Sequence, residues 1–188
     1  GSIHQGHISL INRSNRNCKK TVVSIFVNPK QFNSKKDFKN YPVNLKNDIK
    51  VLKKTKKVDF LYIPQFKDIY DNKKKSNIKI KKKDKILCAK YRKGHFEGVL
   101  EVIDRLTYLI KPKKMFLGKK DFQQHYLIKN FLKGKYKVAV VPCATIRDKN
   151  KIALSSRNNL LNIDDIKKAS LLSGELIKLK KKLVNYKR

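Results

Sequence analysis

The sequence predicts an α/β fold in which helices cover a parallel sheet. Short β-type runs alternate with stretches that carry apolar residues at helical spacing, which is the pattern of parallel strands joined by helical crossovers. The length of 188 residues fits one such domain and part of a second. A hydrophobic content of 40% is enough to build a buried core, so global disorder is a poor description of this chain.

Short runs of β-branched and aromatic residues predict the strands. The run 21–27 (TVVSIFV) has no polar interruption except Ser24, which predicts a strand buried on both faces. The run 58–63 is stopped by Pro64. Two further strands are expected at 115–117 and 137–141.

Apolar residues at helical intervals predict the helices, at 43–54, 96–110, 121–132 and 164–183. Gly134 should end the third of these, and Asp164 with Asp165 should favour the positive end of the last. An amphipathic helix with Ile8, Leu10 and Ile11 should follow the HxGH segment 4–7. We expect the segment 28–42 to be a loop, and 73–90 to be irregular or a β-hairpin.

The formal charge of +34 invites a nucleic-acid interpretation, but the type of cation argues against it. The chain has 41 lysines and 7 arginines, and the lysines are spread over nearly every polar segment. Sequence-specific nucleic-acid readers use arginine forks and aromatic platforms, and tryptophan is absent here. We therefore expect a lysine-biased surface, with no specific nucleic-acid partner.

Cysteine usage and hydropathy indicate the cellular compartment of the protein. Cys18, Cys88 and Cys143 are widely spaced and odd in number, without metal-ligand spacing, so we expect reduced core thiols. Apolar runs are short, and no hydrophobic stretch follows a basic start. The sequence therefore predicts a cytoplasmic protein without a membrane partner.

The segment from His4 to His7 is an HxGH motif directly before a short amphipathic helix. Imidazoles and free backbone amides at a helix amino end suit a phosphate group. The alternatives are exposed terminal histidines, or two metal ligands that lack a third nearby.

The segment 26–32 (FVNPKQF) leads from a strand into Asn-Pro. Ligands of open α/β sheets bind beyond the carboxyl ends of the strands, so Asn28 and Gln31 could offer amide hydrogen bonds to a small polar substrate. The alternative is an ordinary turn, for which Asn-Pro is a common signal.

The segment 118–124 (GKKDFQQ) lies between a predicted strand and a predicted helix. Gly118 lets the backbone approach a ligand, Lys120 can meet a phosphate, and Asp121 can bind ribose hydroxyls or cap the helix. A glycine-plus-cap loop explains all of this except the two consecutive glutamines.

The segment 154–158 (LSSRN) places two hydroxyls before a guanidinium. Arginine forks onto two phosphate oxygens while hydroxyls take others, so this is a phosphate-binding arrangement. The alternative is a plain surface loop.

Taken together, these segments resemble the pantothenate synthetase (pantoate–β-alanine ligase) family of the HIGH-type nucleotidyltransferase superfamily. The resemblance runs from Gly1 to about Asn162 and includes the order HQGH, VVSIFVNPKQF, YP, RKGHFEGV, FLGKKDFQQ and IALSSRN. It implies ATP-dependent condensation of pantoate with β-alanine through pantoyl adenylate, with release of AMP and pyrophosphate.

The resemblance also implies roles for residues that match the family motifs. His7, Lys120, Ser156 and Arg157 would be catalytic, with His7 acting as an acid toward the departing pyrophosphate. Pantoate and β-alanine would be bound by Asn28, Gln31 and Gln124. ATP would be held by a larger set: Gly1, His4, Gly6, His7, Gly118, Lys120, Asp121, Ile146, Leu154, Ser155, Ser156 and Arg157. Mg²⁺ would bind the triphosphate oxygens, with no metal site made of protein ligands.

The chain departs from the family at its ends and at three positions. The family implies a Rossmann-like sheet whose first strand precedes Gly1, so residues 1–157 would form an amino-terminally truncated ATP- and pantoate-binding domain. Residues 158–188 would begin a smaller lid and dimerisation domain of a homodimer. Without that strand we expect two exposed sheet edges and low stability. Lys119, Glu97 and Lys151 stand where the family usually has Glu, Arg and Gly.

Two other functions stay open on the sequence. The chain could be another HIGH-type adenylyltransferase, or an inactive fragment whose lysines bind RNA or another polyanion. The identity of the products separates these possibilities, because only the synthetase converts pantoate and β-alanine into pantothenate.

Overall fold

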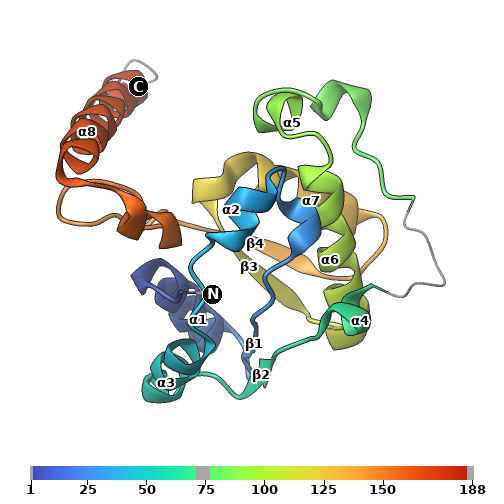
Figure 1. Cartoon of the computed structure of the whole chain (residues 1–188). Helices are drawn as coiled ribbons and strands as arrows, with labels where there is room; N and C mark the ends of the chain where they lie inside the picture. The colour runs from blue at the N-terminus through green and yellow to red at the C-terminus, as the bar shows by residue number, and fades with distance from the viewer. Residues whose placement is uncertain (1, 71–76, 186–188) are drawn as a thin grey trace.

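The computed structural model describes residues 2–70 and 77–185, in which helices and strands alternate (Figure 1). The strands are β1 (Val22–Ser24), β2 (Phe60–Tyr62), β3 (Lys114–Gly118) and β4 (Ala139–Cys143). The α-helices are α1 (Gln5–Asn17), α2 (Lys35–Lys39), α3 (Leu45–Thr55), α4 (Phe66–Ile69), α5 (Cys88–Tyr91), α6 (His95–Ile110), α7 (Phe122–Lys133) and α8 (Ile163–Asn185). Single 3₁₀ turns are η1 (Pro29–Gln31), η2 (Lys82–Asp84), η3 (Lys119–Asp121) and η4 (Ser156–Leu160).

The strands pair in parallel, which confirms the predicted mixed α/β class. Among the described residues they form two separate pairs, β1 with β2 and β3 with β4, where the sequence predicted one sheet. Val22 is opposite Phe60 in the first pair, and Lys114 is opposite Ala139 in the second. The strands also differ in length from the prediction, since β1 and β2 are three residues each and β4 begins two residues later.

The predicted burial of the first strand on both faces is wrong. Val22 is 41% exposed and Ser24 is also exposed, so β1 has one open face despite its β-branched sequence. Its partner β2 is similar, with Phe60 59% exposed. The residue types of this segment predicted a strand. The burial of its side chains depends on neighbouring elements, and β1 lacks these within the described residues.

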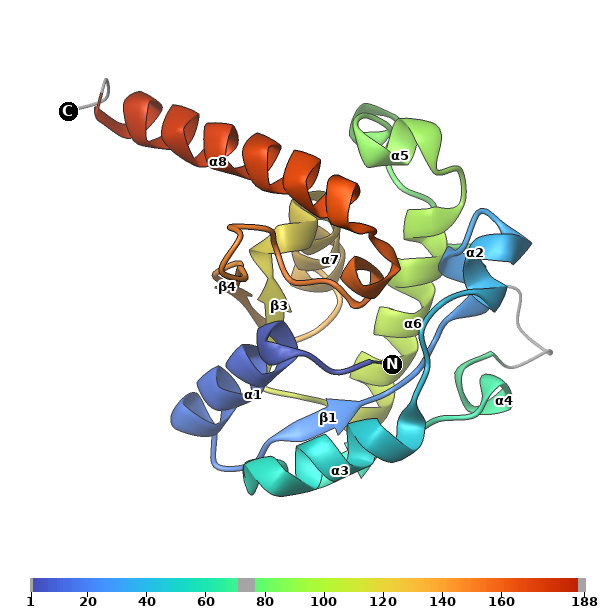
Figure 2. The same cartoon turned by 60° about the vertical axis from the view of Figure 1, so that its left-hand side comes forward.

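The main core lies between α6, α7 and the β3–β4 pair. The apolar stripe predicted for 96–110 supplies Phe96, Val99 and Leu100, and α7 adds Leu127, Ile128 and Leu132. Met115 and Leu117 alternate along β3 and pack against this cluster, as expected for one face of a strand. Helix α1 also packs against β3, which places the start of α1 beside the end of that strand (Figure 2).

Two segments predicted as loops contain short helices. The segment 28–42 includes η1 and α2, because the side chain of Asn28 accepts the Lys30 amide and that of Ser34 accepts the Asp37 amide. In the lysine-rich segment 73–90, the residues from 77 onward form η2 and α5 and contain no strand. The first part of that prediction lies outside the described residues.

The helix predictions are confirmed with shifts of one or two residues at their ends. Asn44 caps α3, and Gly134 follows the last residue of α7 as predicted. Helix α8 projects from the rest of the chain (Figures 1 and 2). Five leucines along it are more than half exposed: Leu171, Leu172, Leu176, Leu179 and Leu183. The apolar stripe of this helix is therefore uncovered in the described residues.

The turn after β1 is anchored to α6 by a buried amide. Asn28 is 1% exposed, and its amide nitrogen donates to the carbonyl of Gly98 at 2.9 Å. Its amide oxygen accepts the Lys30 amide and the hydroxyl of Tyr70. A Cβ atom on Gly98 would lie 2.7 Å from the Lys30 carbonyl oxygen, so only glycine permits this close approach.

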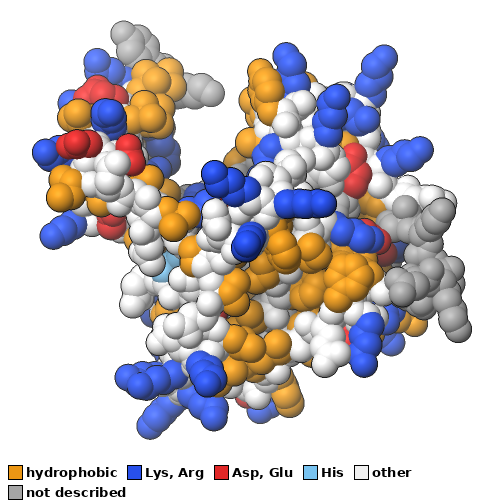
Figure 3. Space-filling model, viewed as in Figure 1, with side chains coloured by type: hydrophobic (Ala, Val, Ile, Leu, Met, Phe, Trp, Pro, Cys, Tyr) orange, Lys and Arg blue, Asp and Glu red, His pale blue; other side chains and the backbone are white. Residues whose placement is uncertain are grey.

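The cysteines are free thiols, as predicted, but they do not all belong to the core. Cys143 is buried, whereas Cys18 is half-buried and Cys88 is exposed at the start of α5. Lysines are scattered over the face in Figure 3 and do not gather in one patch. Within the described residues, no helix combines the length and apolar character that crossing a bilayer requires.

Replacement of Gly98 by alanine should destabilise the fold by about 1–3 kcal/mol, because the new methyl group must push η1 away from α6. Urea unfolding would measure the change. Gly174→Ala is the matched control, since a Cβ atom at Gly174 on α8 meets open space. That control should leave stability unchanged or raise it, because alanine is the better helix former. Equal stability of Gly98→Ala and the parent protein would contradict the close-approach argument.

Candidate functional site

The HxGH motif builds the amino end of α1 from its own imidazoles. His4 is the N-cap residue, and its Nδ1 accepts the Gly6 amide at 3.1 Å. The Nδ1 of His7 accepts the His4 amide at 3.2 Å, which completes a capping box made of two histidines. The two rings stack with centroids 4.0 Å apart. Because both Nδ1 atoms are acceptors, each neutral ring carries its proton on Nε2.

Gly6 is required by the position of the His4 ring. A Cβ atom at Gly6 would lie 2.8 Å from His4 Cε1 and 2.9 Å from Nδ1. The His4 imidazole therefore lies directly over the glycine. This contact explains the central glycine of the motif as a packing requirement of the capping ring.

Both histidines are neutral at pH 7. Burial, followed by the neighbouring His4, lowers the pKa of His7 to about 4. Burial and then the Lys120 ammonium lower the pKa of His4. Lys120 also lowers the pKa of His7, so this cation lies close enough to act on both rings. The three side chains thus form one group of hydrogen-bond donors.

The LSSRN loop is bound to the same end of α1. The hydroxyl of Ser156 donates to the Ser2 carbonyl at 3.3 Å, and Ser156 is buried. The Leu154 amide donates to the Ile146 carbonyl at 2.9 Å, within the short antiparallel turn that returns the chain. Leu154 packs next to Gly6, since its Cβ is 3.8 Å from the position of a Gly6 Cβ. The start of the described chain and the loop at 154–156 therefore meet at this point, through residues 154 positions apart.

Arg157 is paired with a carboxylate of another segment. Its Nη2 donates to both oxygens of Asp37, at 3.2 and 3.0 Å, and its guanidinium lies 4.8 Å from the ring centre of Tyr41. The hydroxyl of Ser155 accepts the Arg157 amide and caps η4. The guanidinium is thus held by the segment that follows η1.

The end of β3 leads directly into the third motif. Lys120 pairs with Asp121 at 3.3 Å, and both are exposed. Asp121 precedes α7 but makes no side-chain cap bond. A Cβ atom on Gly118 would meet no atom within 4 Å. The space beside Gly118 is therefore open, as a ligand-approach role for this glycine requires.

The glutamines of the second and third motifs differ in whether their side-chain amides are hydrogen-bonded. Gln31 and Gln124 are half-buried, and within the described residues no hydrogen bond is made by either side-chain amide. Gln123 instead donates to the carbonyls of Asp84 and Ile86 and accepts the Ala89 amide, so it pins the segment before α5. One of the two consecutive glutamines is therefore structural.

Most of the predicted residues come together, but not all of them. His4, Gly6, His7, Lys120, Leu154 and Ser156 lie around the amino end of α1. Asp121 is paired with Lys120, and Arg157 directly follows Ser156 in the chain; both also influence the pKa of His95. Asn28 makes three internal hydrogen bonds with its side-chain amide, which suits a supporting role. Gly1 lies outside the described residues.

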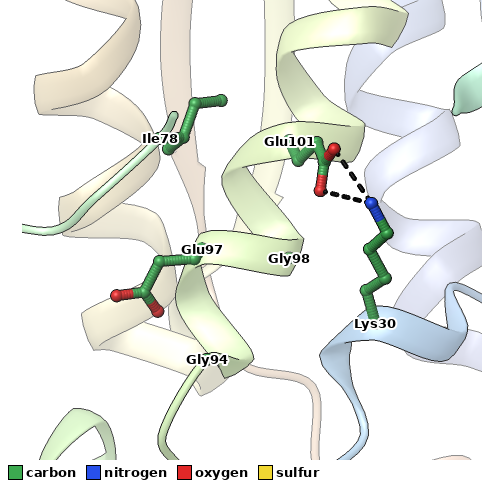
Figure 4. A pocket seen from close by; sticks show the side chains of 6 residues that line it. All are labelled: Lys30, Ile78, Gly94, Glu97, Gly98 and Glu101. Atoms are coloured by element: carbon green, nitrogen blue, oxygen red, sulfur yellow. Dashed lines mark hydrogen bonds and ion pairs between the residues drawn. The ribbon is translucent and has the colours of Figure 1, made fainter. Parts of the chain in front are cut away.

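A separate hollow of about 320 Å³ lies along α6 and contains none of the predicted site residues (Figure 4). It is lined by Lys30, Ile78, Gly94, Glu97, Gly98 and Glu101. Lys30 donates to both oxygens of Glu101 across it, at 3.1 Å each, while Glu97 points away (Figure 4). This hollow is therefore distinct from the group around α1.

Sequence reasoning missed three residues that organise the site. His95 contacts the Gln31 carbonyl through Nδ1 and is 6% exposed, although its motif was part of the resemblance. Asp37 holds Arg157, and Asp48 accepts the amides of Ser2 and Ile3. No local pattern marks these two carboxylates, because their partners lie far away in the sequence, between 45 and 120 positions.

The side chains of the described residues offer few ligands for a metal ion. No group of three or more His, Cys, Asp or Glu side chains able to hold a metal ion occurs in residues 2–70 and 77–185. Around α1 the available groups are imidazole N–H, ammonium and hydroxyl. These groups are hydrogen-bond donors that suit an anion.

Comparison with known proteins gives one consistent family. The family model described as pantoate-beta-alanine ligase matches residues 1–188. The pantothenate synthetase of Leptospira interrogans is 45% identical over 181 residues, which cover 95% of this chain and 63% of that protein. The bifunctional pantoate ligase/cytidylate kinase of Prochlorococcus marinus is 44% identical over 187 residues, 96% of this chain and 36% of that protein.

Solved structures agree with the sequence comparison. The crystal structure of pantothenate synthetase from Thermus thermophilus has a TM-score of 0.89 and 33% identity, and the match covers 94% of this chain and 64% of that one. The pantoate-beta-alanine ligase of Francisella tularensis, complexed with beta-gamma ATP and beta-alanine, has a TM-score of 0.87 and 40% identity, and the match covers 93% of this chain and 67% of that one. The chain thus spans less than two thirds of the length of several relatives that it matches.

Protonation of His7 should lower the stability of the fold in mild acid. The pKa of His7 is about 4 in the folded chain and near 6.5 when the chain is unfolded, so between these values the unfolded state binds more protons. The free energy of unfolding should therefore fall as the pH drops from about 6.5 to about 4. Urea unfolding across this range should show a smaller pH slope for His7→Gln, and identical slopes would contradict the assignment.

Gly6→Ala should displace the His4 ring, because the methyl group would occupy the space under the imidazole. Nitrogen-15 NMR of the imidazoles would then show His4 released from its single Nε2–H tautomer. Gly134→Ala is the control, since a Cβ atom there meets nothing within 4 Å. An unchanged His4 tautomer in Gly6→Ala would show that the ring does not depend on this contact.

Proposed function

Because the chain belongs to the pantoate-beta-alanine ligase family, we propose that the full-length protein joins pantoate to β-alanine at the expense of ATP. The products are pantothenate, AMP and pyrophosphate, formed through pantoyl adenylate. The observation that carries this proposal is the junction at the start of α1, where His4, His7, Lys120 and Ser156 meet. Three segments distant in sequence supply these four polar side chains to one place.

In the first step, a carboxylate oxygen of pantoate attacks the α-phosphorus of ATP. The bond from this phosphorus to the bridging oxygen breaks, and its electron pair leaves with pyrophosphate. Negative charge grows on the phosphate oxygens during this step. Preorganised donors that face such charge stabilise the transition state. We assign this work to Lys120, to the two imidazoles and to the hydroxyl of Ser155. The hydroxyl of Ser156 donates to the Ser2 carbonyl in the free chain, so it would join them only by exchanging that bond for one to a phosphate oxygen.

In the second step, the amine of β-alanine attacks the acyl carbon of pantoyl adenylate. The bond between that carbon and the phosphate oxygen breaks, AMP leaves with the electron pair, and the amine loses a proton as the amide forms. No covalent intermediate on the protein is needed. Catalysis then consists of positioning and charge stabilisation, which matches a site of donors without an activated nucleophile.

The protonation state of His7 refines its role. A general acid needs a proton that it can give up, and at pH 7 the free chain holds His7 as a neutral imidazole. We therefore assign the Nε2–H of His7, like that of His4, to neutral hydrogen bonding with phosphate oxygens. A donor without net charge can still bind phosphate oxygens through its N–H.

The remaining residues keep their predicted places in the proposal. Gln31 and Gln124 bind pantoate with their uncommitted amides, and Asn28 supports them by fixing η1 on α6. Gly118, Asp121 and the backbone at Ile146 and Leu154 hold adenosine. Arg157 reaches the outer phosphates from its place beside Asp37.

Mg²⁺ accompanies ATP in this proposal and is held by phosphate oxygens and water. That arrangement fits the donor set, because the groups around α1 offer hydrogen bonds and no carboxylate cage among the residues described. The ion would supply additional neutralisation of phosphate charge.

For the architecture, we propose that the two strand pairs are parts of one Rossmann-like sheet. A strand outside residues 1–188 would lie between β1 and β3, and the exposure of Val22 supports this. Residues 1–157 would bind ATP and pantoate, and residues 158–188 would begin a lid and dimerisation domain. The uncovered leucines of α8 support the second boundary.

The decisive test supplies the full-length protein with ATP, Mg²⁺, pantoate and labelled β-alanine and measures labelled pantothenate. We expect labelled pantothenate, with AMP formed in equal amount. A dinucleotide or another adenylylated product would indicate a different adenylyltransferase. Salt-sensitive RNA binding without AMP release would indicate a polyanion-binding protein.

Removal of one charge-stabilising donor should slow the reaction strongly. Lys120→Ala and Arg157→Ala should each lower kcat/KM by about 10²–10³-fold, the usual effect of losing one transition-state donor. Lys119→Ala is the matched control, because Lys119 neighbours His125 and does not contribute to the pKa shifts of His4 and His7. Full turnover in Lys120→Ala would exclude its assigned role.

A further inference from the structure

Asp48 is a carboxylate that the fold buries completely. It lies in the first turn of α3 and is 0% exposed. Its Oδ2 accepts the Ser2 amide at 2.9 Å and its Oδ1 accepts the Ile3 amide at 2.7 Å. A buried charge is costly unless it is hydrogen-bonded, and both oxygens are satisfied here by backbone amides of a distant segment.

These bonds lead directly into the segment 4–7, which we call the histidine turn. The amides of Ser2 and Ile3 go to Asp48, and the next amide, that of His4, goes to the Nδ1 of His7. Three consecutive backbone N–H groups are thus bound by side chains before α1 begins. Ser2 has a φ of 60°, a left-handed conformation that a residue with a side chain adopts only when its surroundings hold it there.

The segment of Ser2 and Ile3 that binds Asp48 also contacts the LSSRN loop. The Ser2 carbonyl accepts the Ser156 hydroxyl at 3.3 Å, so the residue whose amide binds Asp48 positions Ser156 through its other end. Asp48 therefore connects α3 with both the histidine turn and the loop at 154–157. In Figure 2, α3 and α1 lie close together below the rest of the fold.

We propose that Asp48 is a positioning residue of the site: by holding Ser2 and Ile3 it sets the two imidazoles and Ser156 around one phosphate-binding space. The ATP-binding measurement that tests this inference rests on the proposed function. The inference goes beyond that function because it attributes the arrangement of the donors to a residue that contacts no substrate. The strained Ser2 keeps its conformation because two charge-assisted bonds hold its segment.

A purely structural carboxylate and a positioning carboxylate predict different results. Loss of a structural contact lowers stability alone, whereas loss of positioning also releases the imidazoles from their fixed tautomers and weakens ATP binding. Asp48→Asn tests this directly, because the amide group keeps the size of the side chain but turns one acceptor into a donor facing a backbone N–H.

The control variant is Asp59→Asn. Asp59 also accepts a backbone amide, that of Thr21 at 2.8 Å, at the beginning of β1 and away from the histidine turn. Both variants remove one carboxylate that binds backbone. They should lose stability in urea unfolding, but only Asp48→Asn should alter the site.

Two readouts on the full-length protein decide the matter. Nitrogen-15 NMR should show His4 and His7 as single Nε2–H tautomers in the parent and in Asp59→Asn, and as tautomer mixtures in Asp48→Asn. The Kd for ATP with Mg²⁺, from calorimetry, should rise at least tenfold in Asp48→Asn and stay unchanged in Asp59→Asn. Unaltered tautomers and Kd in a folded Asp48→Asn protein would overturn the inference.

A double variant covers the case in which Asp48→Asn fails to fold. Ser2→Gly with Asp48→Asn removes the cost of the left-handed residue, because glycine adopts positive φ freely. It should regain stability while the imidazoles remain mixed, and single tautomers in this variant would also overturn the inference. If the parent protein binds no ATP, the proposed function fails, and the imidazole spectra still test Asp48.

Discussion

The arrangement of the site depends on backbone amides that are bound by side chains at the start of α1. The first amides of a helix have no partner within the helix, and here imidazole nitrogens take two of them. This choice fixes each Nδ1 as an acceptor and leaves the proton of each neutral ring on Nε2. Helix capping and the proposed phosphate binding would therefore use opposite nitrogens of the same ring. A serine or aspartate cap would satisfy the helix equally but would leave no outward donor.

Local regularity was predictable from the sequence. The helical spacing of apolar residues predicted α6 and α7 to within a residue or two. Each of these helices buries one continuous apolar stripe, and such a stripe is visible in the sequence alone. The burial of β1 was not predictable, since it depends on what lies beside the strand. Similar reasoning applies to the candidate site: the motifs predicted His4, His7 and Ser156 as site residues because their side-chain chemistry is visible in a few residues.

Long-range contacts were beyond sequence reasoning. Asp48 in the first turn of α3 has the same sequence signature as any acidic residue that favours the positive end of a helix. Asp37 likewise reads as a residue of a polar loop, yet it binds Arg157 from 120 positions away. A carboxylate and its partner are linked by the path of the chain, so only coordinates reveal the pair.

The three departures from the family pattern have separate physical meanings. Lys151 has a φ of 66°, which explains why relatives favour glycine at this place: lysine can adopt the turn, at the cost of backbone strain. Glu97 lines the hollow on α6, away from the histidines.

Lys119, the departure next to Lys120 in the sequence, acts on His125 instead of on the histidine pair. The cation that bears on His4 and His7 is Lys120, which stands at the family's own lysine position. Exposed lysines elsewhere on the surface are screened by solvent and salt. The lysine-rich composition therefore changes the surface of this chain far more than it changes the charge at the histidine turn, where the neutral rings, the Lys120 ammonium and the buried Asp48 carboxylate set the electrostatics.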